Sequence, residues 1–280
     1  MADVGRYNRL TIARFADIGA YLSDGQGNEI LLPKRYLPRE PEPEVGDALE
    51  VFVYLDSEDR PIATTERAKV QVGEFASLKV VEINKIGLFL DWGLSKDLLL
   101  PYSEEKRPLK TGDYCVVHVY LDRHSGRPTA SAKVDRFLDK SAAHYTPGQA
   151  VDVLIAEATD LGFKAIINNQ HWGLLHKNEL FKFVRRGMRE QAFIREIRPD
   201  GKISLTLQQP GRAGAESLQE QIIAALQENG GVLMLSDKSS PHEIEQWFKV
   251  SKGSFKKAIG ALYKQGALVI HPDRIELPEA

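Results

Sequence analysis

The feature that most constrains this chain is a pattern of twenty residues that occurs three times. Each copy has an Ile-Gly or Leu-Gly pair, an apolar segment, a turn and a second apolar segment. The copies are IGAYLSDGQGNEILLPKRYL at 18–37, IGLFLDWGLSKDLLLPYSEE at 86–105 and a looser LGFKAIINNQHWGLLHKNEL at 161–180. Two short apolar segments joined by a turn predict a β-hairpin. Repetition at this scale predicts a series of similar domains.

Further predicted strands flank each copy. One strand precedes it, at 9–15, 76–83 and 150–158. A Gly, a strand, a polar turn and another strand follow it, within 45–65, 111–132 and 185–207. Each repeat therefore has about five short strands, and closing them into a barrel leaves no unpaired edge. Gly19, Gly87 and Gly162 start the second strand, where we expect a bulge or sharp bend.

The C-terminal segment has a different period. After a stretch rich in Pro and Gly at 209–214, apolar residues recur at helical spacing within 216–231. Ser240 to Glu243 has the composition of a capping box at the start of a second helix. A third helix is predicted over 251–266, followed by a two-stranded hairpin. This order resembles a winged helix-turn-helix domain.

The repeats resemble the S1 domain, the OB-fold RNA-binding barrel of ribosomal proteins and ribonucleases. In the third copy, GLLHKNE at 173–179 resembles the family's Gly-Leu-Val-His-x-Ser-Glu, and GKISL at 201–205 resembles its closing strand. Pro33 and Pro101 replace the family histidine in the first two copies. Three S1-like barrels before a winged helix resemble the CvfB (YitL-like) bacterial RNA-binding proteins. The resemblance implies RNA binding in the regulation of gene expression, without catalysis.

The predicted fold class is mainly β with a C-terminal α+β domain. We expect tandem five-stranded OB-fold barrels and then a winged helix, at 1–67, 68–145, 146–210 and 215–280. The first barrel is acidic, with 8 Lys and Arg against 13 Asp and Glu. The second barrel has 12 Lys and Arg against 10 Asp and Glu, and the third, counted to residue 212, has 10 Lys and Arg against 7 Asp and Glu. This gradient favours the second and third barrels for an anionic partner.

An OB barrel binds single strands through a basic groove with aromatic stacking platforms. Tyr21 and Phe89 occupy the position where S1 domains typically carry an exposed aromatic, and Lys164 stands there in the third repeat. Packing across the hairpin is the alternative role for the two aromatics, whereas alternation places Trp92 with Leu88 and predicts a position in the core or at the barrel rim. The predicted RNA-binding residues are Tyr21, Phe89, Lys164, His171, Trp172, His176, Lys182, Arg185, Arg186 and Arg189.

Lysines of the third predicted helix are candidates for contacts with a nucleic-acid backbone. They are Lys252, Lys256, Lys257 and Lys264. Arg, Asn and Gln are the side chains that usually read base edges in the major groove, and this helix offers only Gln265. Duplex DNA is therefore less favoured as a partner than RNA or another protein.

The sequence indicates no catalytic site, cofactor or metal site. One cysteine gives no thiolate cluster, and the spacing of His171 and His176 is not a zinc motif. No apolar run approaches about 18 residues, so we expect a cytoplasmic protein without a membrane partner. Our leading interpretation is a non-enzymatic protein that binds single-stranded RNA through its second and third barrels, alone or in a ribosome or ribonuclease complex. Two alternative functions stay open, namely a DNA-binding regulator that acts through the winged helix and a protein-interaction scaffold.

Overall fold

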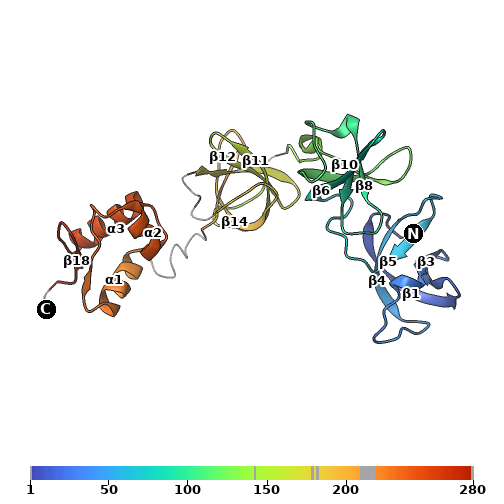
Figure 1. Cartoon of the computed structure of the whole chain (residues 1–280), viewed down its shortest axis with the longest axis horizontal. Coiled ribbons are helices and arrows are strands. Elements are labelled where there is room, and N and C mark those ends of the chain that lie inside the picture. The colour runs from blue at the N-terminus through green and yellow to red at the C-terminus, as the bar shows by residue number, and fades with distance from the viewer. Residues whose placement is uncertain (1, 142, 178–179, 181–182, 209–217, 279–280) are drawn as a thin grey trace.

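Three closed barrels follow one another along the chain and precede a helical domain (Figure 1). This computed structural model describes all residues except 1, 142, 178–179, 181–182, 209–217 and 279–280. The predicted fold class is confirmed, because each barrel has five strands and the C-terminal domain combines three helices with a small sheet. No helix in the described part of the chain is long and apolar enough to cross a membrane.

Strand order is the same in all three barrels. The first barrel consists of β1 (Arg6–Ala16), β2 (Gly19–Ser23), β3 (Glu29–Pro33), β4 (Ala48–Leu55) and β5 (Pro61–Thr64), in the order β1-β2-β3-β5-β4. The third and fifth strands pair in parallel and close the barrel, whereas the other pairs are antiparallel. Alternation directs Ile12, Leu22 and Leu32 into the barrel, where they are fully buried.

The second and third barrels repeat this topology. The second consists of β6 (Phe75–Asn84), β7 (Gly87–Asp91), β8 (Leu98–Pro101), β9 (Tyr114–Leu121) and β10 (Pro128–Ser131). The third consists of β11 (Ala150–Thr159), β12 (Gly162–Ile167), β13 (His171–His176), β14 (Arg189–Ile197) and β15 (Ile203–Thr206). Short 3-10 helices occur at η1 (Lys34–Tyr36), η2 (Tyr102–Glu104) and η3 (Val134–Arg136). The hairpins predicted from the repeat are β2-β3, β7-β8 and β12-β13.

The repeated glycine lies where two strands approach closely. Gly162 pairs with His176 and has φ +151°, and a Cβ there would overlap the carbonyl oxygen of Leu175. The expected bulge lies one strand earlier, where the β11-β12 register shifts between Ile155 and Glu157. The same arrangement recurs at Gly19 and Gly87. A glycine is therefore required for backbone contact at this corner of each barrel.

The apolar core of the second barrel extends onto the first barrel, whose own interior forms a separate cluster. Phe52, on β4, lies edge-to-face against Trp92 with the ring centroids 5.4 Å apart. Trp92 is 3 % exposed and donates a hydrogen bond from Nε1 to the carbonyl of Lys96. Its predicted place in the core is thus confirmed, although the core extends beyond a single barrel. The shared cluster holds the first barrel against the second.

A second apolar cluster joins the second and third barrels. Phe75, at the start of β6, packs there with Leu154 and Ile166 of the third barrel. The guanidinium of Arg189 donates a hydrogen bond to the backbone carbonyl of Phe75. The backbone N–H of Phe75 donates to the side-chain oxygen of Asn169 at 3.2 Å. The two barrels are therefore joined by buried apolar surface and by hydrogen bonds.

The C-terminal domain contains α1 (Leu218–Glu228), β16 (Val232–Leu233), α2 (Pro241–Phe248), α3 (Lys252–Lys264), β17 (Val269–Ile270) and β18 (Ile275–Glu276). The predicted capping box is present, because the Ser240 hydroxyl accepts from the Glu243 N–H and the Glu243 carboxylate accepts from the Ser240 N–H. The hairpin β17-β18 is extended by β16, which pairs with β18. Sequence analysis missed β16, since two residues are too few to show a period.

Candidate nucleic-acid interface

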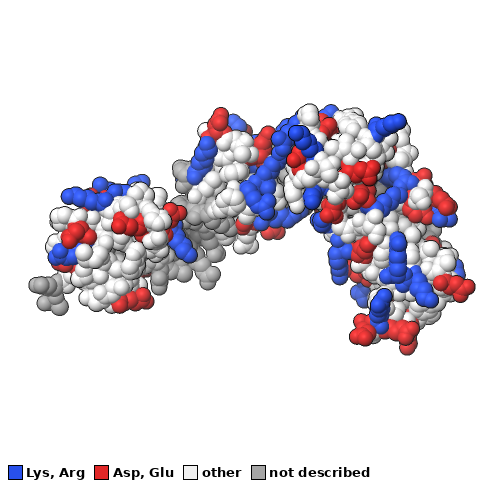
Figure 2. Space-filling model, in the orientation of Figure 1, with Lys and Arg blue, Asp and Glu red and all other residues white. Residues whose placement is uncertain are grey.

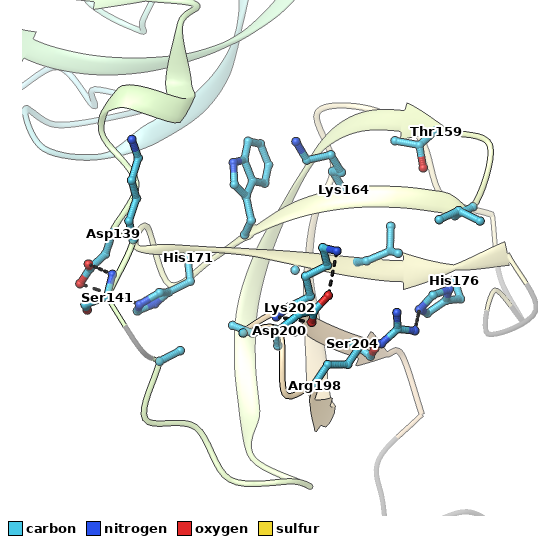
Figure 3. A pocket seen from close by; sticks show the side chains of 18 of the residues that line it. Asp139, Ser141, Thr159, Lys164, His171, His176, Arg198, Asp200, Lys202 and Ser204 are labelled. Atoms are coloured by element: carbon cyan, nitrogen blue, oxygen red, sulfur yellow. Dashed lines mark hydrogen bonds and ion pairs between the residues drawn. The ribbon is translucent and has the colours of Figure 1, made fainter.

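A pocket of about 800 Å³ lies on the outer face of the third barrel (Figure 3). Its base consists of residues on β12, β13 and β15. Its rim consists of the β11-β12 turn at 159–161, the β14-β15 turn at 198 and 200–202, and the segment that enters the barrel at 139–141 and 143. OB folds bind oligonucleotides on this face and with the corresponding loops.

The pocket brings together four of the predicted RNA-binding residues. Lys164 on β12 and His171, Trp172 and His176 on β13 all line it (Figure 3). The Nζ of Lys164 lies 4.2 Å from the centroid of the Trp172 ring, which is the geometry of a cation–π contact. The hairpin register pairs Lys164 with Leu174 and Ile166 with Trp172, so Lys164, Trp172 and His176 lie on one face of the hairpin. His171 pairs with Ile167 and alternates to the other face, at the edge of the pocket.

Hydrogen bonds hold two of these rings in place. The indole Nε1 of Trp172 donates to the Asp135 carboxylate at 2.9 Å, and Asp135 belongs to η3 of the second barrel. The Nδ1 of His171 lies 3.0 Å from the hydroxyl of Tyr145. Its Nε2 is buried, has no hydrogen-bond partner among the described residues, and lies 3.8 Å from the carboxylate of Asp139. Both rings are thus oriented by residues outside the hairpin.

Sequence analysis missed the cations on the β14-β15 turn. Arg198 and Lys202 line the pocket, and Lys202 forms a 2.8 Å ion pair with Asp200 on the same turn. The Nη2 of Arg198 lies 3.5 Å from the Nε2 of His176 (Figure 3). A polar turn was predicted between the last two strands of the repeat, but its approach to β13 depends on closure of the barrel. Closure of the barrel was predicted and is confirmed, but the turn residues that it brings to β13 were not identified.

The predicted arginine run is divided among different surroundings. Arg185 and Arg186 are exposed and lie outside this pocket, and Arg186 lines a smaller cavity between the second and third barrels. Arg189 donates to the Phe75 carbonyl and so joins the two barrels. Lys182 lies outside the described residues. The run therefore does not form one continuous wall of the pocket.

The corresponding face of the second barrel is partly covered. Phe89 is half-buried and lines a cavity of about 270 Å³ that residues of β4 in the first barrel also line. At its rim, Arg127 pairs with the Asp59 carboxylate at 2.5 Å, and Lys96 donates to the carbonyl of Leu55 at 3.2 Å. Burial lowers the pKa of Lys96. These cations are thus engaged by the first barrel.

The corresponding aromatic of the first barrel is also covered on one side. The guanidinium carbon of Arg14 lies 3.8 Å from the centroid of the Tyr21 ring. Arg14 in turn pairs with the Glu29 carboxylate at 2.7 Å. Tyr21 is half-buried and stacks on its neighbour's guanidinium in this structure.

The four lysines predicted on the third helix lie on α3. Lys252 donates to the carbonyl of Lys238 at 3.2 Å, and Lys256 pairs with the Asp237 carboxylate at 3.1 Å. Lys257 and Lys264 have exposed side chains. Two of the four lysines therefore also contact the loop that precedes α2.

The chemistry of the described residues offers no metal centre. No three His, Cys, Asp or Glu side chains among them are grouped so that they could hold a metal ion. Cys115 is buried, and burial raises the pKa of its thiol to about 11. A thiol with such a pKa stays protonated at neutral pH and is a poor nucleophile.

Comparison with known proteins assigns domains to most of these elements. The sequence profile of the S1 domain matches residues 4–66 and 72–133, and that of the CvfB-like winged helix domain matches residues 220–277. The third barrel lies outside these ranges, although its strands follow the same order as those of the first two.

Similar proteins extend over almost the whole chain. The YitL protein of Bacillus subtilis is 29 % identical over 271 residues, which cover 94 % of this chain and 89 % of that protein. Conserved virulence factor B of Staphylococcus aureus is 26 % identical over 266 residues, covering 92 % and 88 %. A crystal structure of a multidomain protein with nucleic acid binding domains from Streptococcus pneumoniae is 24 % identical, covers 98 % of both chains and has a TM-score of 0.42. The chain thus belongs with the proteins that join S1 domains to a CvfB-like winged helix domain.

Proposed function

We propose that this chain is a cytoplasmic, non-enzymatic protein that binds single-stranded RNA in the pocket of the third barrel. The observation that carries the proposal is the composition of that pocket. Lys164, Arg198 and Lys202 surround a base that includes Trp172 and Leu174. Cations of this kind pair with phosphates, while aromatic and apolar surfaces take the faces of unstacked bases.

A single strand suits this site better than a duplex. The pocket is concave and has apolar surface at its base, which suits the exposed face of an unpaired base. His176 also lines the pocket, and its imidazole can exchange a hydrogen bond with a ribose 2′-hydroxyl. The S1 domains of the chain support RNA as the ligand, and the resemblance to the CvfB proteins supports a role in post-transcriptional regulation.

The second barrel has a smaller part in this proposal. Phe89 would stack on a base only at the edge of its cavity, because the first barrel borders the same cavity. Tyr21 would need to exchange the guanidinium of Arg14 for a base. We therefore assign the principal contacts to the third barrel and secondary contacts to Phe89 and Tyr21.

Fluorescence anisotropy with a labelled single-stranded RNA of mixed sequence tests the proposal. Lys202→Gln removes one pocket cation, so the slope of log K against log salt should become shallower by about 0.7, the contribution of one phosphate contact on a single strand. Lys85→Gln removes an exposed lysine from the second barrel and should leave the slope unchanged. Equal slopes for both variants and the native chain would contradict the proposal.

A second candidate function is DNA binding through the winged helix. It is favoured by Lys257 and Lys264, which are both exposed on α3. Replacing both by Glu in the full chain separates the two functions. Loss of duplex DNA binding together with unchanged RNA binding would support a DNA-binding role, whereas little affinity for duplex DNA in the native chain would exclude it.

A further inference from the structure

Trp172 lines two cavities at once. One is the pocket of the third barrel, and the other is a cavity of about 230 Å³ between the second and third barrels, which we call the junction cleft. The junction cleft is lined by Lys106, Arg107, Leu109, Cys115, Val116, Ala132, Val134, Ala156, Glu157, Trp172 and Arg186. Because the indole belongs to both linings, the two cavities are adjacent and Trp172 forms the boundary between them.

The junction cleft is basic at its rim and apolar at its base. Lys106 and Arg107 come from the segment after η2 in the second barrel, and Arg186 comes from the third barrel. All three are exposed, and Glu157 is the one carboxylate in the lining. Figure 2 shows Lys and Arg side chains gathered where the third barrel meets the second. An anion that enters the cleft would therefore meet an excess of positive charge.

The size of the third-barrel pocket indicates that a bound strand must extend beyond it. Its volume lies in the range of roughly 300–1,000 Å³ that encloses one drug-sized molecule. An OB fold, however, takes about 4–16 nucleotides of a single strand. Part of the strand therefore lies outside the pocket. The junction cleft is the adjacent place for it, because its cations lie next to Trp172, which also lines the pocket.

We propose that the RNA strand bound in the third barrel passes Trp172 and enters the junction cleft, where Lys106, Arg107 and Arg186 contact its phosphates. This inference rests on the proposed function. Asp135 has a positioning role in it, because its 2.9 Å hydrogen bond fixes the indole at the boundary of the two cavities. The binding site is then shared by two barrels, and the second barrel contributes cations from its side next to the third.

Glu157 leads to a prediction in the opposite direction, because removing its charge should strengthen RNA binding, whereas removing a cation should weaken it. Its carboxylate lies 3.5 Å from the Nζ of Lys106 across the boundary of the two barrels. A phosphate in the cleft would compete with this carboxylate for the lysine and would be repelled by it. Removing the negative charge should therefore strengthen RNA binding, whereas a purely structural ion pair would not give this result.

The test uses the full chain and two labelled RNAs of mixed sequence, about 4 and about 12 nucleotides long. The double variant Lys106→Gln/Arg107→Gln should make the salt slope of the longer RNA shallower by about 1.4, two single-strand phosphate contacts, and leave that of the shorter RNA unchanged. Glu157→Gln should tighten binding of the longer RNA by about twofold to fivefold, the range for an exposed charge pair. The double variant Lys85→Gln/Lys110→Gln is the matched control, since it removes two exposed lysines of the second barrel.

The outcomes separate this inference from the proposed function. If the longer RNA binds with the same salt slope in the native chain and in Lys106→Gln/Arg107→Gln, the proposed path through the junction cleft is wrong. The proposal that RNA binds in the third-barrel pocket is then unaffected. Equal weakening of both RNAs would also overturn it, because the charges would then act at a distance. If neither RNA binds the native chain, the proposed function and the inference fail together.

Discussion

Acidification should destabilise the chain at a buried histidine on β9. His118 is 8 % exposed, and its ring stacks on Phe137 with the centroids 4.0 Å apart. It also contacts Phe75, so it lies beside the cluster that joins the second and third barrels. Its Nδ1 is buried and has no hydrogen-bond partner in the part of the chain that the structure describes. A charge on this imidazole would therefore be poorly solvated.

The magnitude follows from the shift in its pKa. Burial lowers the pKa of His118 from 6.5 to about 4. The unfolded chain thus binds a proton between these two pH values while the folded chain does not, and the free energy of unfolding falls as the pH drops below about 6.5. Between pH 7 and pH 5 the loss is about 2 kcal/mol, and its limit below pH 4 is about 3 kcal/mol at 1.36 kcal/mol for each pKa unit.

Urea unfolding at pH 7 and pH 5, followed by circular dichroism, measures this difference. His118→Phe keeps a ring between Phe75 and Phe137 but cannot titrate, so its loss of stability on acidification should be smaller by about 2 kcal/mol. Other titrating groups contribute equally to both proteins and cancel in the comparison. The same loss in both proteins would refute the reasoning, as would a native chain that becomes more stable at pH 5.

Three further predictions concern separate elements. Asp135→Ala should weaken RNA binding at the third barrel by releasing the Trp172 indole, while Asp135→Asn keeps an acceptor and should bind nearly as the native chain does in anisotropy measurements. Gly162→Ala should lower the stability of the third barrel by at least about 2 kcal/mol in a thermal melt, because its Cβ would overlap a backbone carbonyl. Ser240→Ala should cost about 1 kcal/mol through loss of the α2 cap, visible as lower helix content at intermediate urea concentrations.

The architecture was predictable because the relevant signals are local. Alternation, turn residues and the capping box at Ser240 depend only on nearby positions, and they predicted the three barrels and the three helices correctly. The β2-β3, β7-β8 and β12-β13 hairpins fall within the three repeats of the sequence. Sequence analysis did not predict β16, because its two residues pair with a strand more than forty positions away.

The candidate site was predictable only in part. Lys164 and His176 lie on one hairpin, so their proximity follows from its register. Arg198 and Lys202 join them only after the barrel closes, and the hydrogen bond from Trp172 to Asp135 requires a neighbouring barrel. Contacts between barrels depend on how whole domains pack, and the period of a strand carries no signal for that.

Contacts within a barrel and packing between barrels together explain why three similar repeats give three different surfaces. In the first barrel Arg14 covers one side of Tyr21, and in the second the first barrel approaches Phe89 and engages Arg127. In the third barrel the entering segment at 139–141 and 143 forms a rim and leaves a pocket of about 800 Å³. The position two residues after the repeated glycine thus holds a partly covered aromatic in two barrels and a lysine beside an open pocket in the third. The neighbours of each repeat, more than its own motif, determine which face can receive a ligand.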